Sequence, residues 1–269
     1  MGGGDAYGMS QKGRLAARVM AASKAAKIAK VSRLGIIASA ILTFMIFSIS
    51  YYGQKVGNFT FTLDRLALES GMTLYDNAED KEFKTKIIAD QVSEADGMTA
   101  YCGIRDNEGN LLTPFPVGDS VCMPADEWLT SIDGPNNGDN YLAYTFYLEH
   151  VGTKDVDLQA SIRLVSASKG AEEAVRVRVL FDGIGETYAK LQSETSKNPG
   201  EPEPLTTAFL GITTVMEKTF FRLIPGSVIK VTVILWYEGE DSNHNLNLHS
   251  GGVKFEMGFT VTRIYQLND

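Results

Sequence analysis

Hydrophobic residues follow two different patterns along this chain. From Leu34 to Tyr52, 19 consecutive residues carry no charge. Beyond Tyr52, apolar residues alternate with polar ones in short runs. A helix that crosses the hydrocarbon core of a bilayer needs about 20 predominantly apolar residues, whereas a period of two is typical of a half-buried strand. The pattern therefore divides the chain into one candidate membrane span and a β-rich region.

The uncharged run predicts a transmembrane helix. It ends in two tyrosines, whose rings favour the headgroup zone of a membrane. A buried core helix and a cleavable secretory signal are the alternatives. Ala38-Ser39-Ala40 has the pattern of a cleavage site, but it lies inside the run, which is also longer than the roughly 7–15 residues of a signal core. We favour an uncleaved signal-anchor, with processing near 48–52 as the alternative.

Charge differs in sign between the two sides of this run. Residues 1–33 contain seven Lys or Arg and one Asp, a net charge of +6, whereas the whole chain carries −8. The residues after Arg33 therefore sum to −14. The positive-inside rule places residues 1–33 in the cytoplasm as a basic, partly helical tail and residues 53–269 outside the cell. The tail either lies on the anionic inner leaflet or is solvated and sets only the topology.

The outer region, residues 53–269, reads as one β domain. Val228 to Tyr237 is apolar on both faces, which indicates a central strand. Turn-forming residues separate the runs, and two segments, 78–93 and 187–195, are candidates for short helices. The fold class expected is mainly β: an antiparallel, jelly-roll-like β-sandwich ectodomain preceded by one long N-terminal transmembrane helix. The predicted strands are 58–68, 141–151, 156–166, 174–181, 228–237 and 252–264.

The only two cysteines, Cys102 and Cys122, lie in the outer region and flank a segment rich in Gly and Pro. An oxidising exterior would let them form a disulfide and close a loop. Two buried free thiols are the alternative. We favour the disulfide.

Candidate chemistry is sparse. The sequence contains no metalloprotease, Cys-x-x-Cys or Gly-x-Ser-x-Gly motif, so we predict no enzyme and no catalytic residues. His244 and His249 lie near two acids, but their spacing matches no standard metal site, and solvated loop histidines are favoured.

A polar segment at 133–140 is the one candidate cation site. Asp133 and Asp139, together with three asparagines between and beside them, could offer oxygen ligands to Ca²⁺. The same residue types are what any polar turn uses, and a plain turn is favoured. No other cofactor is expected.

Trp236 is the candidate core anchor. It lies near the end of the central strand, where its ring would pack in the core and its N–H would be bonded at the rim. Gly239 would allow a tight turn beyond the strand, and Asp241 would bond a backbone N–H in that turn.

Several stretches together resemble surface-exposed proteins of Gram-positive, Firmicutes-type bacteria that are distantly similar to the TasA/camelysin family. These stretches are 52–60, 141–148, 174–179, 234–241 and 251–259. The resemblance implies an N-terminal secretion segment followed by a jelly-roll β-sandwich, and TasA-like members build extracellular matrix fibres. Ser242-Asn243-His244 stands where related sequences have a Cys, and the small-residue cleavage site and the Gly/Thr/Ala-rich mature start of fibre-forming members are missing. Camelysin-like members are reported as metalloproteases, but no catalytic motif can be carried over to this chain.

The leading functional hypothesis is a non-enzymatic, single-pass surface protein with a structural or adhesive role in the cell envelope or matrix. A fibre subunit is the first alternative, in which Phe59, Phe61 and Leu63 insert into a neighbour's sheet by β-augmentation. A sensory ectodomain with a concave ligand pocket is the second, and an extracytoplasmic hydrolase is the last. The expected partners are the lipid bilayer and either copies of this chain or other envelope proteins. The chain carries a net charge of −8, whereas a general nucleic-acid binder needs clustered cations to neutralise phosphates. No nucleic-acid partner is therefore expected.

Overall fold

The computed structural model describes residues 59–92, 97–100, 102–103, 121–243 and 251–266. These residues belong to one compact unit, Val56–Asp269. Within them, no helix is long and apolar enough to cross a membrane. The predicted span from Leu34 to Tyr52 and the basic tail lie outside the described residues.

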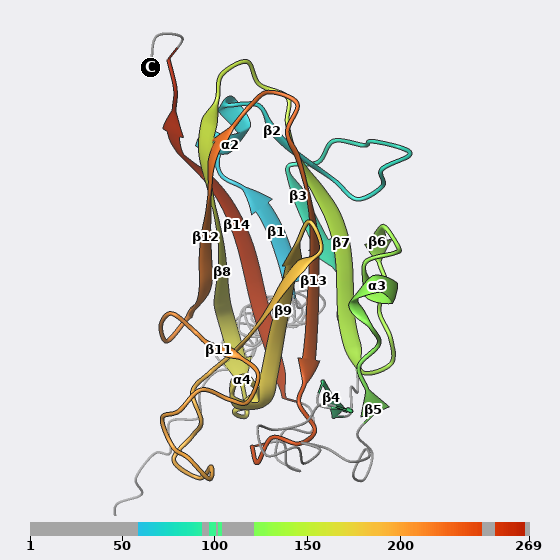
Figure 1. Cartoon of the computed structure of the whole chain (residues 1–269), viewed down its shortest axis with the longest axis vertical. Helices are drawn as coiled ribbons and strands as arrows, with labels where there is room; N and C mark the ends of the chain where they lie inside the picture. The colour runs from blue at the N-terminus through green and yellow to red at the C-terminus, as the bar shows by residue number, and fades with distance from the viewer. Residues whose placement is uncertain (1–58, 93–96, 101, 104–120, 244–250, 267–269) are drawn as a thin grey trace, which may run out of the picture. The chain divides into compact units, whose positions relative to one another are not determined.

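Two sheets account for most of the described chain (Figure 1). The five-stranded sheet has the spatial order β12 (Thr214–Leu223), β8 (Val156–Ser168), β14 (Gly252–Ile264), β1 (Phe59–Leu63) and β3 (Lys86–Ala89). The seven-stranded sheet has the order β11 (Thr207–Ala208), β10 (Ile184–Ala189), β9 (Val175–Phe181), β13 (Val228–Tyr237), β7 (Tyr141–His150) and β2 (Met72–Tyr75), with β6 (Gly134–Pro135) also paired to β7. The smaller elements are the pair β4 (Met98–Thr99) and β5 (Val121–Cys122) and the helices α2 (Arg65–Glu69), α3 (Asp126–Leu129) and α4 (Ala171–Ala174).

The main core lies between the two sheets. Phe61 of β1 is fully buried, and its ring centroid lies 4.9 Å from that of Phe59 on the same strand and 4.4 Å from that of Phe146 on β7. The inward face of β7 is the one that the alternation predicted, since Leu142, Tyr144, Phe146 and Leu148 all belong to this core. The period-two pattern therefore identified this strand and its buried face.

β13 is the centre of the seven-stranded sheet, as its apolar residues on both faces predicted. It lies between β9 and β7. Its inward residues join the main core, and its other face carries Ile234 and Trp236, which pack in a second buried cluster. Neighbouring strands add Tyr141, Ala143 and Leu180 to that cluster, and the segments that bear Met98 and Leu129 cover it. Both faces of the strand are thus covered by protein, which is why apolar residues occur on both.

The strand pairing corrects the expectation of a purely antiparallel sandwich. Most neighbouring strands are antiparallel, but β1 pairs in parallel with β14, β10 with β11, and β4 with β5. A parallel pair needs a long connection between its strands, and nearly the whole domain separates β1 from β14. The first and last strands described can therefore lie side by side and run in the same direction.

The two predicted short helices are wrong. Segment 78–93 contains β3, whose Ile87 and Ala89 point into the core while Lys86 and Ile88 are exposed. Segment 187–195 begins with the end of β10. In both segments pairing with a neighbouring strand outweighs a weak local helix propensity. The predicted strand 58–68 is too long, because β1 ends at Leu63 and the chain then forms α2, where Asp64 Oδ1 accepts a hydrogen bond from the Ala67 N–H at 2.7 Å.

Candidate functional site

The candidate site lies on the outer face of the seven-stranded sheet, near the end where β4 and β5 are found (Figure 1). The valines of β9 point into the core, so Arg176 and Arg178 point to the other face. Alternation alone places such residues in solvent. Arg176 is instead only 1% exposed, because segments from elsewhere in the chain cover this part of the sheet.

Arg176 forms a buried ion cluster with two carboxylates. Its Nη2 lies 2.7 Å from Asp241 Oδ2 and 3.3 Å from Glu203 Oε2, and all three side chains are more than nine-tenths buried. Asp241 Oδ1 also accepts the N–H of Asn243 at 2.8 Å, which is the turn contact that the sequence predicted for this residue. Burial and then the nearby charge of Asp241 raise the pKa of Glu203 above its usual value, although Arg176 opposes the shift.

Glu238 and Trp236 lie beside this cluster at the end of β13. Glu238 is fully buried, and its Oε2 accepts the indole N–H of Trp236 at 3.2 Å and the backbone N–H of Ala100 at 3.3 Å. Trp236 is 2% exposed, so its ring is buried and its N–H is bonded. Its place differs from the expected one, because it packs in the second cluster, outside the core between the sheets.

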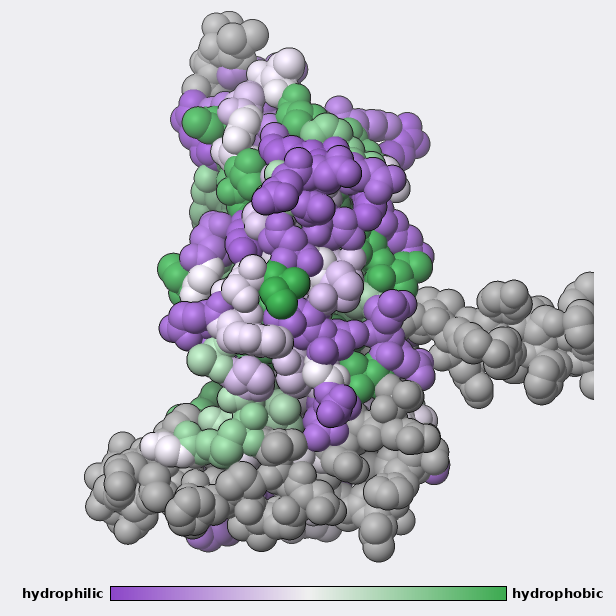
Figure 2. Space-filling view, turned by 90° about the vertical axis from the view of Figure 1, so that its right-hand side faces the viewer, coloured by the Kyte–Doolittle hydropathy of each residue, from purple (hydrophilic) through white to green (hydrophobic). Residues whose placement is uncertain are grey.

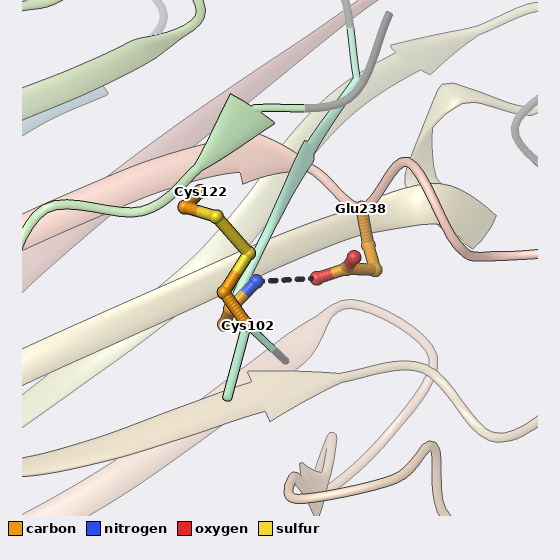
Figure 3. Close-up of a disulfide and its surroundings, with 4 residues drawn as sticks. Cys102, Cys122 and Glu238 are labelled. Atoms are coloured by element: carbon orange, nitrogen blue, oxygen red, sulfur yellow. Dashed lines mark hydrogen bonds between the residues drawn. A yellow bond between two sulfur atoms is a disulfide. The ribbon is translucent and has the colours of Figure 1, made fainter. Parts of the chain in front are cut away.

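Cys102 and Cys122 form a disulfide, with an S–S distance of 2.08 Å. It joins the chain segments that contain β4 and β5, and Figure 3 shows Glu238 bonded to the backbone beside it. The Gly239 N–H also donates to the Met98 carbonyl at 2.9 Å. The disulfide-bearing segment is therefore tied to the end of the central strand.

A second ion pair lies closer to solvent. Arg178 forms two parallel hydrogen bonds with Asp126, the first residue of α3, from Nε to Oδ1 at 2.9 Å and from Nη2 to Oδ2 at 2.6 Å. Its Nη1 donates to Thr187 Oγ1 on β10, also at 2.9 Å. Such a fork arrangement fixes the orientation of both planar groups. It also ties α3 to β9.

These side chains line a cavity of about 270 Å³. Residues of β9, β10 and β13 line it together with the segment around the disulfide and the chain at 205–206. The lining residues are Ala100, Met123, Pro124, Ala125, Asp126, Arg176, Arg178, Thr187, Leu205, Thr206, Trp236 and Glu238. Both polar and apolar side chains therefore face the same small space.

Comparisons with known proteins give no family for this chain. No family model matches it, and no curated protein matches its sequence. Among solved structures it resembles parts of two crystal structures of a β-glucosidase from Kluyveromyces marxianus, one selenomethionine-labelled and one in complex with glucose. The identities are 14% and 12% and the TM-scores 0.20 and 0.21, over 44% and 69% of this chain but only 11% and 15% of that enzyme. Likenesses this weak carry no argument about fold or activity.

The predicted polar turn at 133–140 lies away from the cavity lining. Asp133 accepts the hydroxyl of Tyr147 at 2.7 Å and the N–H of Ala78 at 2.8 Å, and Asn137 accepts the N–H of Ala143 at 2.9 Å. These contacts hold the turn against neighbouring strands. Across the described residues no group of three acidic, His or Cys side chains is placed to hold a metal ion. Ca²⁺ binding by Asp133 and Asp139 therefore gains no support.

The other predicted site residues fall in two places. His244 and His249 lie outside the described residues. Phe59, Phe61 and Leu63 form β1, which is paired on both sides within its own chain, to β14 and β3. Insertion of this strand into a neighbour stays a prediction.

Of the residues that build the cavity, sequence reasoning singled out Trp236, as a core anchor, and missed the charged ones. Arg176 and Arg178 look like the polar positions of an ordinary half-exposed strand. Asp126 lies in a stretch that contains none of the motifs considered. The one local hint is the acidic run that follows Trp236, because acids directly after a central strand need partners if they are buried. Those partners come from segments far apart in the chain.

Proposed function

We propose that this chain is a single-pass membrane protein that displays a jelly-roll-like β-sandwich outside the cell, with a structural or adhesive role in the cell envelope. Residues 34–52 would form the anchor and residues 1–33 would remain in the cytoplasm. The observation that carries the proposal is the disulfide between Cys102 and Cys122. Disulfides persist in oxidising exterior compartments and are rare in the cytosol, and here one occurs in the acidic domain that follows the uncharged run.

The surface of the domain suits display in water. On the face shown in Figure 2, hydrophilic residues cover much of the described surface, and strongly hydrophobic ones form separate spots. Scattered apolar residues of this kind are ordinary on a solvated surface and do not indicate a large permanent interface. This face supports a domain that stands free in solvent.

The edge strand β12 supports a discrete domain rather than sheet extension through that edge. Lys218 Nζ lies 4.7 Å from the ring centroid of Phe181 and 5.6 Å from that of Phe220, so a cation points into the rim of the sandwich. The pairing of β12 with β8 is also irregular at two places. Inward-pointing charges and bulges on an edge discourage pairing with another chain.

The redox state of the two cysteines tests the proposal. Intact cells that express the chain are treated with an alkylating reagent, and the protein is then extracted and weighed with and without prior reduction. We expect neither cysteine to be labelled before reduction and both to be labelled after it, because the chain has only these two cysteines. Labelling of both without reduction would contradict an exterior location.

Reduction should also destabilise the purified chain. Closing a loop of this length contributes about 3 kcal/mol in the chain-entropy account, since the two cysteines are 20 residues apart. When a reductant is added, we expect the free energy of unfolding to fall by that amount, so that the midpoint of urea unfolding moves to a lower concentration. The matched control is the double variant Cys102→Ser/Cys122→Ser, whose unfolding curve should be insensitive to reductant.

A further inference from the structure

The cavity beside the disulfide has the features of a binding site for an uncharged ligand. Its charged lining consists of Arg176, Arg178, Asp126 and Glu238, two of each sign. Arg178 and Asp126 neutralise each other through two hydrogen bonds. Arg176 forms an ion pair with Asp241, which does not line the cavity. Glu238 accepts the N–H groups of Trp236 and Ala100. A charged ligand would have to compete with these internal interactions, whereas a neutral polar ligand would not.

Two threonine hydroxyls supply hydrogen-bonding groups of opposite kind. Thr187 Oγ1 accepts from Arg178 at 2.9 Å, so its O–H is a donor at the cavity wall. Thr206 Oγ1 donates to the Glu203 carbonyl at 2.9 Å, so its lone pairs can accept. The oxygens of Asp126 retain further acceptor positions beyond those used by Arg178. A ligand with neighbouring hydroxyl groups, each both donor and acceptor, matches this set.

Apolar side chains complete the lining of the cavity. Leu205 lines it and is 56% exposed, with a backbone φ of 56°. A left-handed conformation is unfavourable for a bulky residue that is not glycine and costs on the order of 1–3 kcal/mol. The fold therefore holds an apolar side chain at the rim of the cavity at some expense in stability. Met123 and Pro124 lie on the wall that the disulfide braces.

We propose that this cavity binds one neutral hexose unit of a glycan. A sugar ring has hydroxyl groups around its edge and C–H groups on its faces, which suits a lining that offers both polar and apolar side chains. The volume of about 270 Å³ lies just below the usual range of small-ligand cavities, so one ring rather than a long chain fits within it. The inference goes beyond the proposed surface role and does not depend on where the chain resides.

Ligand-observed saturation-transfer NMR on the purified full chain in lipid nanodiscs tests this inference. The probes are D-glucose, D-galactose and D-mannose, with glucuronic acid and glucosamine as charged analogues of the first. At least one neutral hexose should show saturation transfer and a saturable titration, and the charged analogues should bind about tenfold more weakly or worse, equivalent to about 1.4 kcal/mol. Failure of every neutral hexose to bind, or tighter binding of a charged analogue, overturns the proposal.

Variants locate the binding in the cavity. Thr187→Val keeps the shape of the side chain and removes its hydroxyl, so affinity should fall by about tenfold. Thr219→Val is the matched control, because Thr219 lies on β12 in the other sheet, and it should leave affinity unchanged. Equal affinities for the two variants would place the sugar elsewhere and overturn the assignment.

A third variant separates binding from stability. Asparagine tolerates the left-handed conformation better than leucine does, so Leu205→Asn should leave the melting temperature unchanged or raise it. The same variant should bind the hexose at least several-fold more weakly, because the apolar side chain is lost. Unchanged affinity would contradict the role given to Leu205.

None of these binding measurements depends on cellular location. Their failure would therefore leave the surface proposal standing, and failure of the surface proposal would leave the hexose-binding proposal standing.

Discussion

Replacing Phe61 by alanine is expected to lower the free energy of unfolding by about 3–5 kcal/mol, the usual range for a buried phenylalanine. The side chain is fully buried, and its ring lies 4.9 Å from that of Phe59 and 4.4 Å from that of Phe146, so it links the two sheets. Equilibrium urea unfolding of the purified chain measures the change. A cavity at this position would remove contacts on both sides of the sandwich.

The control for this variant is Phe221→Ala. Phe221 lies on β12 and is 76% exposed, so its removal should change the free energy of unfolding by no more than about 0.5 kcal/mol. Equal losses for the two variants would contradict the described core.

The unfolding midpoint also tests strand exchange. If β1 stays in its own sheet, the midpoint should not depend on protein concentration. A strand supplied by a neighbour would make the midpoint depend on it.

The second large effect is expected at the buried ion cluster. Arg176→Met should destabilise the fold by about 3–5 kcal/mol, because it removes one partner of a buried pair and leaves the other charge without its guanidinium. Asp241 lies 2.7 Å and Glu203 3.3 Å from that group, and each is more than nine-tenths buried. Arg65→Met is the control, since the Arg65–Glu69 pair is exposed and such pairs contribute little.

The loss at Arg176→Met should depend on pH with a definite sign. Burial already raises the pKa of Glu203 in the folded chain, and loss of the guanidinium, which opposes that shift, would raise it further above its unfolded value. Acids with a raised folded pKa lower stability as pH rises above their unfolded pKa, so the deficit should be largest near neutral pH and shrink under acidic conditions. A deficit that is constant across this range would show that the lost charge interaction is not the cause.

Much of the fold could be predicted because burial leaves a local pattern. The strand at 252–264 was expected with the bounds that β14 has, and the apolar residues on both faces of β13 indicated its central position. Pairing partners leave no such pattern. Nothing near β1 indicates that it lies parallel to β14, because their contact depends on the path of the whole domain.

The candidate site escaped prediction for the same reason. Arg176 alternates with valines as an exposed residue would, and only the return of distant segments buries it. The cavity is built by five separate stretches, near residues 100, 124, 177, 187 and 205, together with the end of β13. Each stretch alone resembles an ordinary strand or turn. The disulfide was predictable, because two cysteines in an expected exterior domain already favour a bond.

The central claim is that the uncharged run crosses a membrane and leaves the β domain outside. The most direct measurement adds a protease to intact cells that express the chain with one epitope tag before Met1 and another after Asp269. The account predicts that the C-terminal tag is removed while the N-terminal tag stays protected until the cells are lysed. Survival of the C-terminal tag until lysis, or loss of the N-terminal tag from intact cells, would contradict it.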